Sequence, residues 1–394
     1  MPLLVIAGIL IIYGIFALFS VSIFESFTTT NKIFSDPSNW FYFNKQLINL
    51  IWAIGAWSFV YIFPLKAFKS NKFLTFLSIM ILLFQFLVFS PLGNNLNGAR
   101  WWLNITGLPS IQPAEFFKVG YVIFLARRFI RKKHLLNSFD IMKKYFAVHF
   151  IIFFVFLLIP DLGSVLVMWI TGLVMCRYSG VNSRNIIKMC SIGFGIGMVA
   201  IISLFAFNNT FCIGDYTKSN PKPNYCKFTY ITKRLSAYTS SDSDTNTKDT
   251  DWQNKQAVIA IGGGGRFWRW YGKGLQKFGY IPEAQSDFIF SAFAEETGFL
   301  GTLILLGLYS SLARHTIKKI PTQKDEYLKI ISIWLISLIM VQMFVNIGVN
   351  TKILPNTGLT LPFISYGGTA LMTNVIMIVL LYKILYTTQS HDYR

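Results

Sequence analysis

The stretch LLVIAGILIIYGIFALFSVSI, residues 3–23, contains no charged side chain. Because a helix that crosses a bilayer needs about 20 predominantly apolar residues, this stretch predicts a transmembrane helix. Further apolar stretches follow along the chain, at residues 46–63, 73–91, 113–126, 145–160, 163–180, 188–207, 286–312, 330–349 and 369–386. We therefore expect an all-α polytopic membrane protein with about ten transmembrane helices and a large outer loop between the seventh and eighth spans.

The composition of the chain points the same way. Hydrophobic residues make up 53% of the 394 residues and charged residues only 13%, whereas a soluble domain carries about 25% charged residues. So few charges cannot cover the surface of a soluble protein of this length. The composition therefore excludes a soluble enzyme, a disordered chain and a fibrous protein.

The positions of Lys and Arg predict the orientation in the membrane. One set of short loops and the C-terminal end hold 20 of the 36 basic residues, within the segments 66–72, 127–144, 177–188, 314–329 and 383–394. The opposite short connections hold Lys32, Lys45, Arg100, Lys118 and Lys352. Because short cytoplasmic loops are rich in Lys and Arg, we expect the first set, and both termini, in the cytoplasm.

One outer connection is long, from about residue 208 to residue 285, within a single membrane domain of residues 1–394. Its Ser/Thr/Asp-rich part, residues 239–251, predicts a segment without fixed structure. Residues 256–285 are Gly-rich and aromatic and predict ordered backbone near the interface. Cys212 and Cys226 lie in this loop, and the sequence is compatible both with a disulfide between them and with two free thiols.

Ionisable residues near the outer ends of the spans indicate where a site could form, because such groups are costly at membrane depth and usually face a cavity or a partner. Glu115 and Lys118 stand at i and i+3 on one helix face, so they can pair, either as a structural ion pair or in a functional role. Asp161, in Ile159-Pro-Asp-Leu-Gly163, fits a helix N-cap as well as a cavity position.

Asp287 stands directly before an apolar stretch. It could cap the helix that begins there or contribute to its first turn, and the other possibility is a catalytic role. Glu295 and Glu296 follow two turns later, inside the apolar stretch. We expect that one of them pairs with a cation and that the other ends a shallow helix arm.

The glycine run Ile261-Gly-Gly-Gly-Gly265 is not a phosphate loop, because no Gly-Lys-Ser/Thr follows and no strand precedes it. We interpret it as a tight backbone segment that lets helices or a ligand approach closely. Basic and aromatic residues alternate from Arg266 to Lys277. They suit either anionic lipid headgroups or simple anchoring in the interface, and nucleic acid is a poor fit because this loop faces outward.

The last outer connection is expected to run through Asn346-Ile-Gly-Val-Asn350 and then from Leu354 to Gly368, where two prolines and three glycines break the helices. Irregular backbone at membrane depth is tolerated where it is buried in protein or lines a cavity. Ser365, Tyr366 and the glycine pair after them are therefore expected at a cavity wall.

At these motifs the chain resembles the SEDS family (shape, elongation, division and sporulation) over nearly its whole length. The motifs that carry the resemblance are Arg100-Trp-Trp with Gln112-Pro-Ala-Glu-Phe-Phe-Lys118, Pro160-Asp-Leu-Gly163, Gln256-Ala-Val-Ile-Ala-Ile-Gly262, Gln276-Lys-Phe-Gly-Tyr-Ile-Pro-Glu283, Asp287-Phe-Ile-Phe with Glu295-Glu-Thr-Gly-Phe, and Leu361-Pro-Phe-Ile-Ser-Tyr-Gly-Gly368.

The resemblance implies a peptidoglycan glycosyltransferase that polymerises lipid II on the outer face of the bacterial cytoplasmic membrane. It also implies a class B penicillin-binding protein as partner, alongside other division or elongation proteins. The family's catalytic aspartate falls on Asp287, and positions similar to its cavity lining are Arg100, Glu115, Lys118, Asp161, Gln256, Ser365 and Tyr366. The sequence from Gly358 to Pro362 resembles the division type more than the elongation type.

The chain departs from the family pattern beside its most important residue. Gln285-Ser286 stand where the family usually has His-Thr, so no histidine assists Asp287 from there. Trp268 and Trp270 replace glycines that usually follow the Gly-Gly pair, which puts the shape of this loop in doubt.

The hypothesis for the reaction is that Asp287 takes the proton of an attacking sugar hydroxyl, a contribution of roughly 10²–10⁴-fold. Arg100, Lys118 and a divalent cation would stabilise the leaving diphosphate, although the sequence shows no dedicated metal site. The rival is a lipid II flippase, which needs polar lining through the full membrane depth, whereas these motifs concentrate at the outer end. A scaffold for the division machinery is a third reading.

Overall fold

A computed structural model describes residues 2–33, 37–96, 99–104, 109–131, 161–211, 248–267 and 272–387, with isolated positions and runs of up to three residues between 132 and 160. Within these residues, five helical segments are long and apolar enough to cross a membrane. They are Pro2–Val21, Asn71–Phe89, Ile289–Thr322, Glu326–Asn350 and Gly368–Thr387. Leu162–Tyr178 is a shorter apolar helix.

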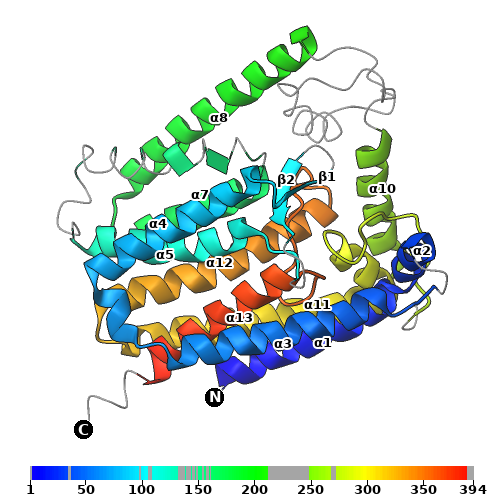
Figure 1. Cartoon of the computed structure of the whole chain (residues 1–394), viewed down its shortest axis with the longest axis horizontal. Helices are drawn as coiled ribbons and strands as arrows, with labels where there is room; N and C mark the ends of the chain where they lie inside the picture. The colour runs from blue at the N-terminus through cyan, green and yellow to red at the C-terminus, as the bar shows by residue number, and fades with distance from the viewer. Residues whose placement is uncertain are drawn as a thin grey trace.

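The helices lie side by side in a bundle (Figure 1). Their bounds are α1 Pro2–Val21, α2 Ile23–Ile33, α3 Phe41–Ile62, α4 Asn71–Phe86, α5 Pro113–Arg131, α7 Leu162–Tyr178, α8 Ser183–Phe211, α10 Lys248–Gly263, α11 Ile289–Lys319, α12 Glu326–Asn350 and α13 Gly368–Tyr382. Short helical turns are η1 Leu65–Lys69, η2 Leu87–Phe89, η6 Ile320–Thr322 and η7 Lys383–Thr387. The polytopic helical fold is confirmed, and a helix coincides with each predicted apolar stretch except 145–160. Most of that stretch lies outside the described residues, so the total of about ten spans stays a prediction.

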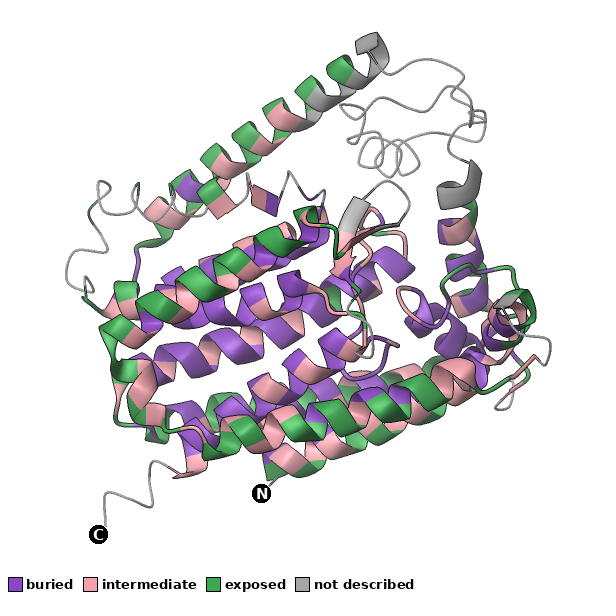
Figure 2. Cartoon of the chain, viewed as in Figure 1, coloured by how far each residue is buried: buried purple, intermediate pink, exposed green. Residues whose placement is uncertain are grey.

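The core of the bundle is formed by α12 and α13 with their neighbours α5, α7 and α11. Figure 2 shows α12 and α13 as mostly buried, whereas α3, α4 and α8 expose much of their surface. The exposed side chains on these outer helices are large and apolar, as with Ile51, Ile62 and Phe76. Apolar side chains that point out of a bundle suit contact with lipid, which agrees with a membrane protein.

A small antiparallel hairpin, β1 Gly93–Leu96 and β2 Ala99–Leu103, was not predicted. Its register shifts between Asn94 and Asn95, which marks a bulge. The indole Nε1 of Trp101 donates to the carbonyl of Ile159 at 2.7 Å and ties the hairpin to the chain just before α7. The dipeptide Asn97-Gly98 between the strands is the sequence signal for such a hairpin.

The long outer loop differs in part from its prediction. Residues 239–247 lie outside the described residues, but 248–251 form the first turn of α10, so the predicted segment without fixed structure extended too far. The first half of α10 is polar, and apolar residues follow from Ala257 to Ile261. Beyond α10, residues 272–288 form a succession of turns that leads into α11.

Close backbone packing explains one glycine of the run at the end of α10, Gly264. A Cβ atom on Gly264 would lie 2.2 Å from the carbonyl oxygen of Ala294 on α11. On the facing side, Gly298 breaks α11 with φ 63° and ψ −166°, a conformation that favours glycine. The predicted role in close helix approach is confirmed, and the break after Glu295 and Glu296 creates the expected short helix arm, residues 289–297.

Candidate functional site

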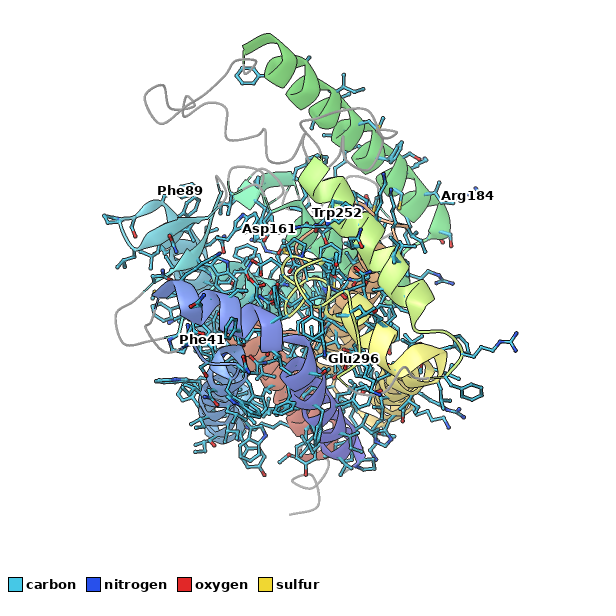
Figure 3. The ribbon with its side chains drawn as sticks, turned by 90° about the vertical axis from the view of Figure 1, so that its right-hand side faces the viewer. Phe41, Phe89, Asp161, Arg184, Trp252 and Glu296 are labelled. Carbon is cyan, nitrogen blue, oxygen red and sulfur yellow. The ribbon has the colours of Figure 1, made fainter. Side chains whose placement is uncertain are left out.

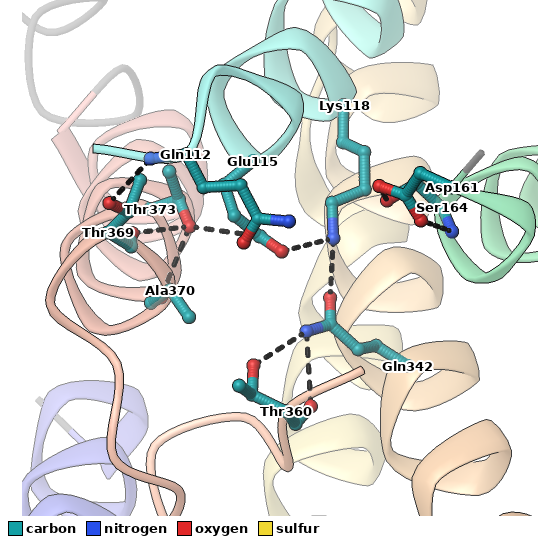
Figure 4. A network of polar contacts seen from close by, with 10 residues as sticks. All are labelled: Gln112, Glu115, Lys118, Asp161, Ser164, Gln342, Thr360, Thr369, Ala370 and Thr373. Atoms are coloured by element: carbon teal, nitrogen blue, oxygen red, sulfur yellow. Dashed lines mark hydrogen bonds and ion pairs between the residues drawn. The ribbon is translucent and has the colours of Figure 1, made fainter. Parts of the chain in front are cut away.

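The predicted pair of Glu115 and Lys118 is present and buried at the start of α5. Lys118 Nζ lies 2.7 Å from Glu115 Oε1, and the two side chains are 1% and 6% exposed. Thr373 on α13 donates to Glu115 Oε2 at 3.4 Å. Gln342 on α12 accepts from Lys118 Nζ at 3.1 Å, so the ion pair joins three helices (Figure 4).

Hydrogen bonds continue from this pair toward Asp287. The amide of Gln342 donates to the carbonyl oxygen of Thr360 at 3.2 Å, and the next residue, Leu361, donates its N–H to Ser365 Oγ at 2.8 Å. Ser365 Oγ in turn donates to the carbonyl of Ser286 at 2.6 Å. The last outer connection therefore lies between the buried ion pair and the residue that precedes Asp287.

The backbone at Asp287 is held by two asparagines of α12. Asn346 Nδ2 and Asn350 Nδ2 donate to the carbonyl of Asp287 at 2.9 and 3.0 Å. The other amide atom of Asn350, Oδ1, accepts from the backbone N–H and the hydroxyl of Ser291 on the first turn of α11 at 3.0 and 2.6 Å. Phe288, and not Asp287, occupies the N-cap position of α11. The alternative that Asp287 is the cap is therefore wrong.

This placement puts Asp287 beside the N-terminus of α11. The dipole of a helix favours negative charge near its N-terminus, which is where Asp287 stands. An ionised carboxylate is the form that accepts a proton.

Tyr366, Tyr42, Glu283 and Glu25 form a cluster of aromatic and acidic side chains, called the rim below, beside the backbone that leads to Asp287. The N–H of Tyr366 donates to the carbonyl of Gln285 at 2.9 Å, and its ring contacts Tyr42 edge-to-face with centroids 4.9 Å apart. Burial, and then the nearby Tyr42 and Glu283, raise the pKa of Tyr366 to about 12, so its hydroxyl stays protonated at neutral pH.

Glu25 on α2 lies on the same rim. Burial raises the pKa of Glu25, and the negative charge of Glu283 raises it further, while Lys32 opposes the shift. Glu283 itself has φ 56°, a conformation uncommon for residues other than glycine. The rim is thus acidic and aromatic, a combination that suits hydrogen bonds to sugar hydroxyls and contact with a sugar ring.

Asp161 takes the N-cap position of α7, as one of its two predicted roles required. Its carboxylate accepts from the N–H of Ser164 at 3.0 Å and from the hydroxyl of Ser164 at 2.7 Å. The side chain also points toward Lys118 in Figure 4, so the cap and the buried ion pair share one polar region.

Two predicted site residues are not joined to these networks by a hydrogen bond in the described part of the chain. The backbone of Arg100 lies in β2, opposite Asn95, and its side chain is outside the described residues. Gln256 is buried on α10, which packs against α11. Trp268, Trp270, Cys212 and Cys226 also lie outside the described residues.

The two residues that depart from the family pattern have structural contacts of their own. Gln285 is 2% exposed, and its side-chain Nε2 donates to Glu283 Oε2 at 3.4 Å. The hydroxyl of Ser286 donates to the same carboxylate oxygen at 3.1 Å. Both side chains therefore orient Glu283 from positions next to Asp287.

Asn346 and Asn350 were expected in the last outer connection, but α12 extends to Asn350 and includes both. Gln342, which also connects the networks, was not predicted. Gln342, Asn346 and Asn350 recur every fourth position in an otherwise apolar helix, and this spacing places them on one face. That periodicity was the available signal. Within the described residues, no group of three or more His, Cys, Asp and Glu side chains is placed to hold a metal ion.

Comparisons with known proteins identify the chain's relatives. A family model with the description FTSW_RODA_SPOVE, cell cycle protein, matches residues 1–390. The "Probable peptidoglycan glycosyltransferase FtsW" of Lactococcus lactis is 32% identical, over 94% of this chain and 87% of that protein. The "Stage V sporulation protein E" of Bacillus subtilis is also 32% identical, over 84% of this chain and 83% of that protein.

Solved structures share the fold at lower sequence identity. The Rod shape determining protein RodA of Thermus thermophilus superposes with a TM-score of 0.58 at 21% identity, covering 98% of this chain and 97% of RodA. A chain from a structure described as "Structural coordination of polymerization and crosslinking by a peptidoglycan synthase complex" superposes with a TM-score of 0.69 at 21% identity, covering 97% and 96%.

Proposed function

Because the chain belongs to the FtsW/RodA/SpoVE family, we propose that it polymerises lipid II into glycan strands with Asp287 as the general base. The protein is a peptidoglycan glycosyltransferase by its relatives. The observation that carries the assignment of the site is the clamp on Asp287, where Asn346 and Asn350 both bind its backbone carbonyl. Such a fixed backbone at the start of a helix supports a residue with a chemical role.

In the proposed reaction, a sugar hydroxyl attacks an anomeric carbon that carries a lipid diphosphate. Asp287 accepts the hydroxyl proton as the new glycosidic bond forms, and the bond from the anomeric carbon to the diphosphate oxygen breaks. Glu283, Gln285 and Tyr366 border Asp287 and would bind the sugars through hydrogen bonds and ring contact.

The leaving diphosphate requires positive charge. The Lys118 side chain is 1% exposed and already pairs with Glu115 and Gln342. In this conformation it would therefore act on the diphosphate through its charge, from beneath the site, and not by direct contact. Arg100 is the proposed direct contact. A divalent cation that arrives with the diphosphate is also proposed. We assign it no step, because the described residues lack a cluster to hold it, and the dependence of polymerisation on added chelator tests it.

We propose that the reaction takes place at the outer face of the bacterial cytoplasmic membrane and that both termini lie in the cytoplasm. A class B penicillin-binding protein that crosslinks the strands is the proposed partner, together with other division or elongation proteins. The Gly358–Pro362 sequence supports a division-type role.

A reconstituted assay with purified lipid II and a class B partner tests the function. Wild-type protein should form glycan polymer, whereas Asp287→Asn should insert and fold but form none, because an amide cannot take the proton. Asp325→Asn, at the opposite end of α12, is the matched carboxylate control and should polymerise normally. Polymer from Asp287→Asn at the wild-type rate would refute the role of Asp287. Transfer of lipid II across vesicles without polymerisation would favour a flippase.

A further inference from the structure

The loop that carries Asp287 is held by hydrogen bonds at both of its ends. Near Asp287 the attachment runs through the asparagines of α12 and the last outer connection. At its other end the loop rests on Glu295 of α11, whose Oε1 accepts from the N–H of Leu275 at 3.0 Å and whose Oε2 accepts from the N–H of Gln276 at 2.9 Å. One carboxylate therefore holds two successive backbone groups.

A buried ion pair adds to this attachment. Lys277 Nζ lies 2.6 Å from Glu296 Oε1, and the two side chains are 1% and 0% exposed. Ser20, at the end of α1, donates to the same Oε1 atom at 2.7 Å and accepts from Lys277 Nζ at 2.9 Å. The triad connects the loop with α1 and α11, and Figure 3 shows Glu296 at this end of the molecule.

The fit between loop and helix is close at this point. A Cβ atom on Gly274 would lie 3.0 Å from Glu296 Cγ and 3.1 Å from Glu295 Oε2. The break at Gly298 follows two residues after Glu296. The arm 289–297 therefore begins next to Asp287 and ends at the contacts that anchor the start of its loop, so the loop and the arm form a closed ring.

We propose that Lys277, Glu295 and Glu296 are positioning residues for glycosyl transfer, because they hold the loop 274–287 on this arm and thereby fix the place of Asp287. The proposal rests on the proposed function of Asp287. A mutation far from the chemistry that misplaces the reacting groups by about 1 Å can lower the rate about 10²-fold. Breaking such a buried pair by removing one partner is strongly unfavourable, because it leaves an uncompensated buried charge.

The test uses Glu296→Gln, Lys277→Gln and the double variant in the full chain with its partner. Each single variant leaves one charge buried without its counterion, so kcat should fall about 10- to 100-fold while KM for lipid II changes by less than about threefold. The double variant can form an amide–amide hydrogen bond and should regain about tenfold of that loss. Glu295→Gln removes one of two backbone acceptors and should give a smaller fall in kcat.

The control is Lys383→Gln at the opposite end of the bundle. Lys383 Nζ donates to the carbonyls of Tyr61 and Phe63 at the end of α3, so its loss should lower the melting temperature and leave kcat intact. If Glu296→Gln and Glu295→Gln have lower melting temperatures but keep wild-type kcat, the contacts of the two glutamates are only structural and the proposal is overturned.

An active Asp287→Asn variant would refute the proposed function itself. An inactive Asp287→Asn variant together with fully active glutamate variants would refute only the positioning role.

Discussion

Lys118 has two separable effects on this protein, because it is both a buried charge and the counterion of Glu115. Removing a cation from a buried pair leaves an uncompensated carboxylate and typically costs about 3–5 kcal/mol. Lys118→Met should therefore lower the unfolding free energy by about that amount. Thermal unfolding in detergent measures it.

The double variant Lys118→Met with Glu115→Gln separates the effects. It removes both charges, so most of the stability should return, yet polymerisation should stay low because the positive charge beneath the diphosphate is gone. Recovery of activity together with stability would show that the pair is a structural ion pair only.

At the scale of elements, two glycines at the end of α10 allow a prediction with an internal control. Gly264 approaches Ala294 too closely for a Cβ atom, whereas a Cβ atom on Gly262 would have no heavy atom of another segment within 4 Å. Gly264→Ala should therefore destabilise by about 1–3 kcal/mol through forced separation of α10 and α11. Gly262→Ala should be neutral or stabilise by up to about 1 kcal/mol. Equal melting temperatures for both variants would contradict the close packing.

The start of α12 predicts a pH dependence. Asp325 accepts from the N–H groups of Tyr327 and Leu328 and lies 2.5 Å from Lys69. Burial alone would raise the pKa of Asp325, but the hydrogen bond and charge of Lys69 and the two N–H groups outweigh it, so this pKa lies below its usual value. A lowered folded-state pKa stabilises the protein above the unfolded value, and this contribution disappears as pH falls through the folded value.

The difference in melting temperature between wild type and Asp325→Asn measures this contribution. It should be largest near pH 7 and shrink toward zero as the pH falls below about 4. A difference that is constant with pH would mean that the charge of Asp325 contributes nothing.

Elements with a local signal could be predicted from the sequence, and contacts between distant segments could not. Apolar runs predicted the helices, and the i, i+3 spacing predicted the pair of Glu115 and Lys118. The partner Gln342 is 224 positions from Lys118, and nothing local to either residue indicates the other. The hairpin at 93–103 was missed because its asparagines and tryptophans lack apolar alternation.

At the scale of the whole molecule, the positive charge is distributed unevenly between the two ends of the bundle. The turns η1 and η6, with Lys69 and Asp325, lie at one end of the bundle, whereas α2, α10 and the Asp287 loop lie at the other (Figure 1). Most Lys and Arg residues of the short loops belong to the first end. The net charge of +19 is therefore explained by the proposed orientation, in which the Asp287 end would be directed away from the cytoplasm.

Single cysteines test this orientation. In a variant whose native cysteines are replaced by serine, Tyr280→Cys would place a thiol in the Asp287 loop, where Tyr280 is 51% exposed. Lys72→Cys would place one at the exposed start of α4. A membrane-impermeant maleimide added to intact spheroplasts should label the first cysteine and not the second, and permeabilised cells should show both labelled. Because lipid II can be polymerised into wall only where the wall lies, labelling of Lys72→Cys alone in intact spheroplasts would contradict both the orientation and the proposed site.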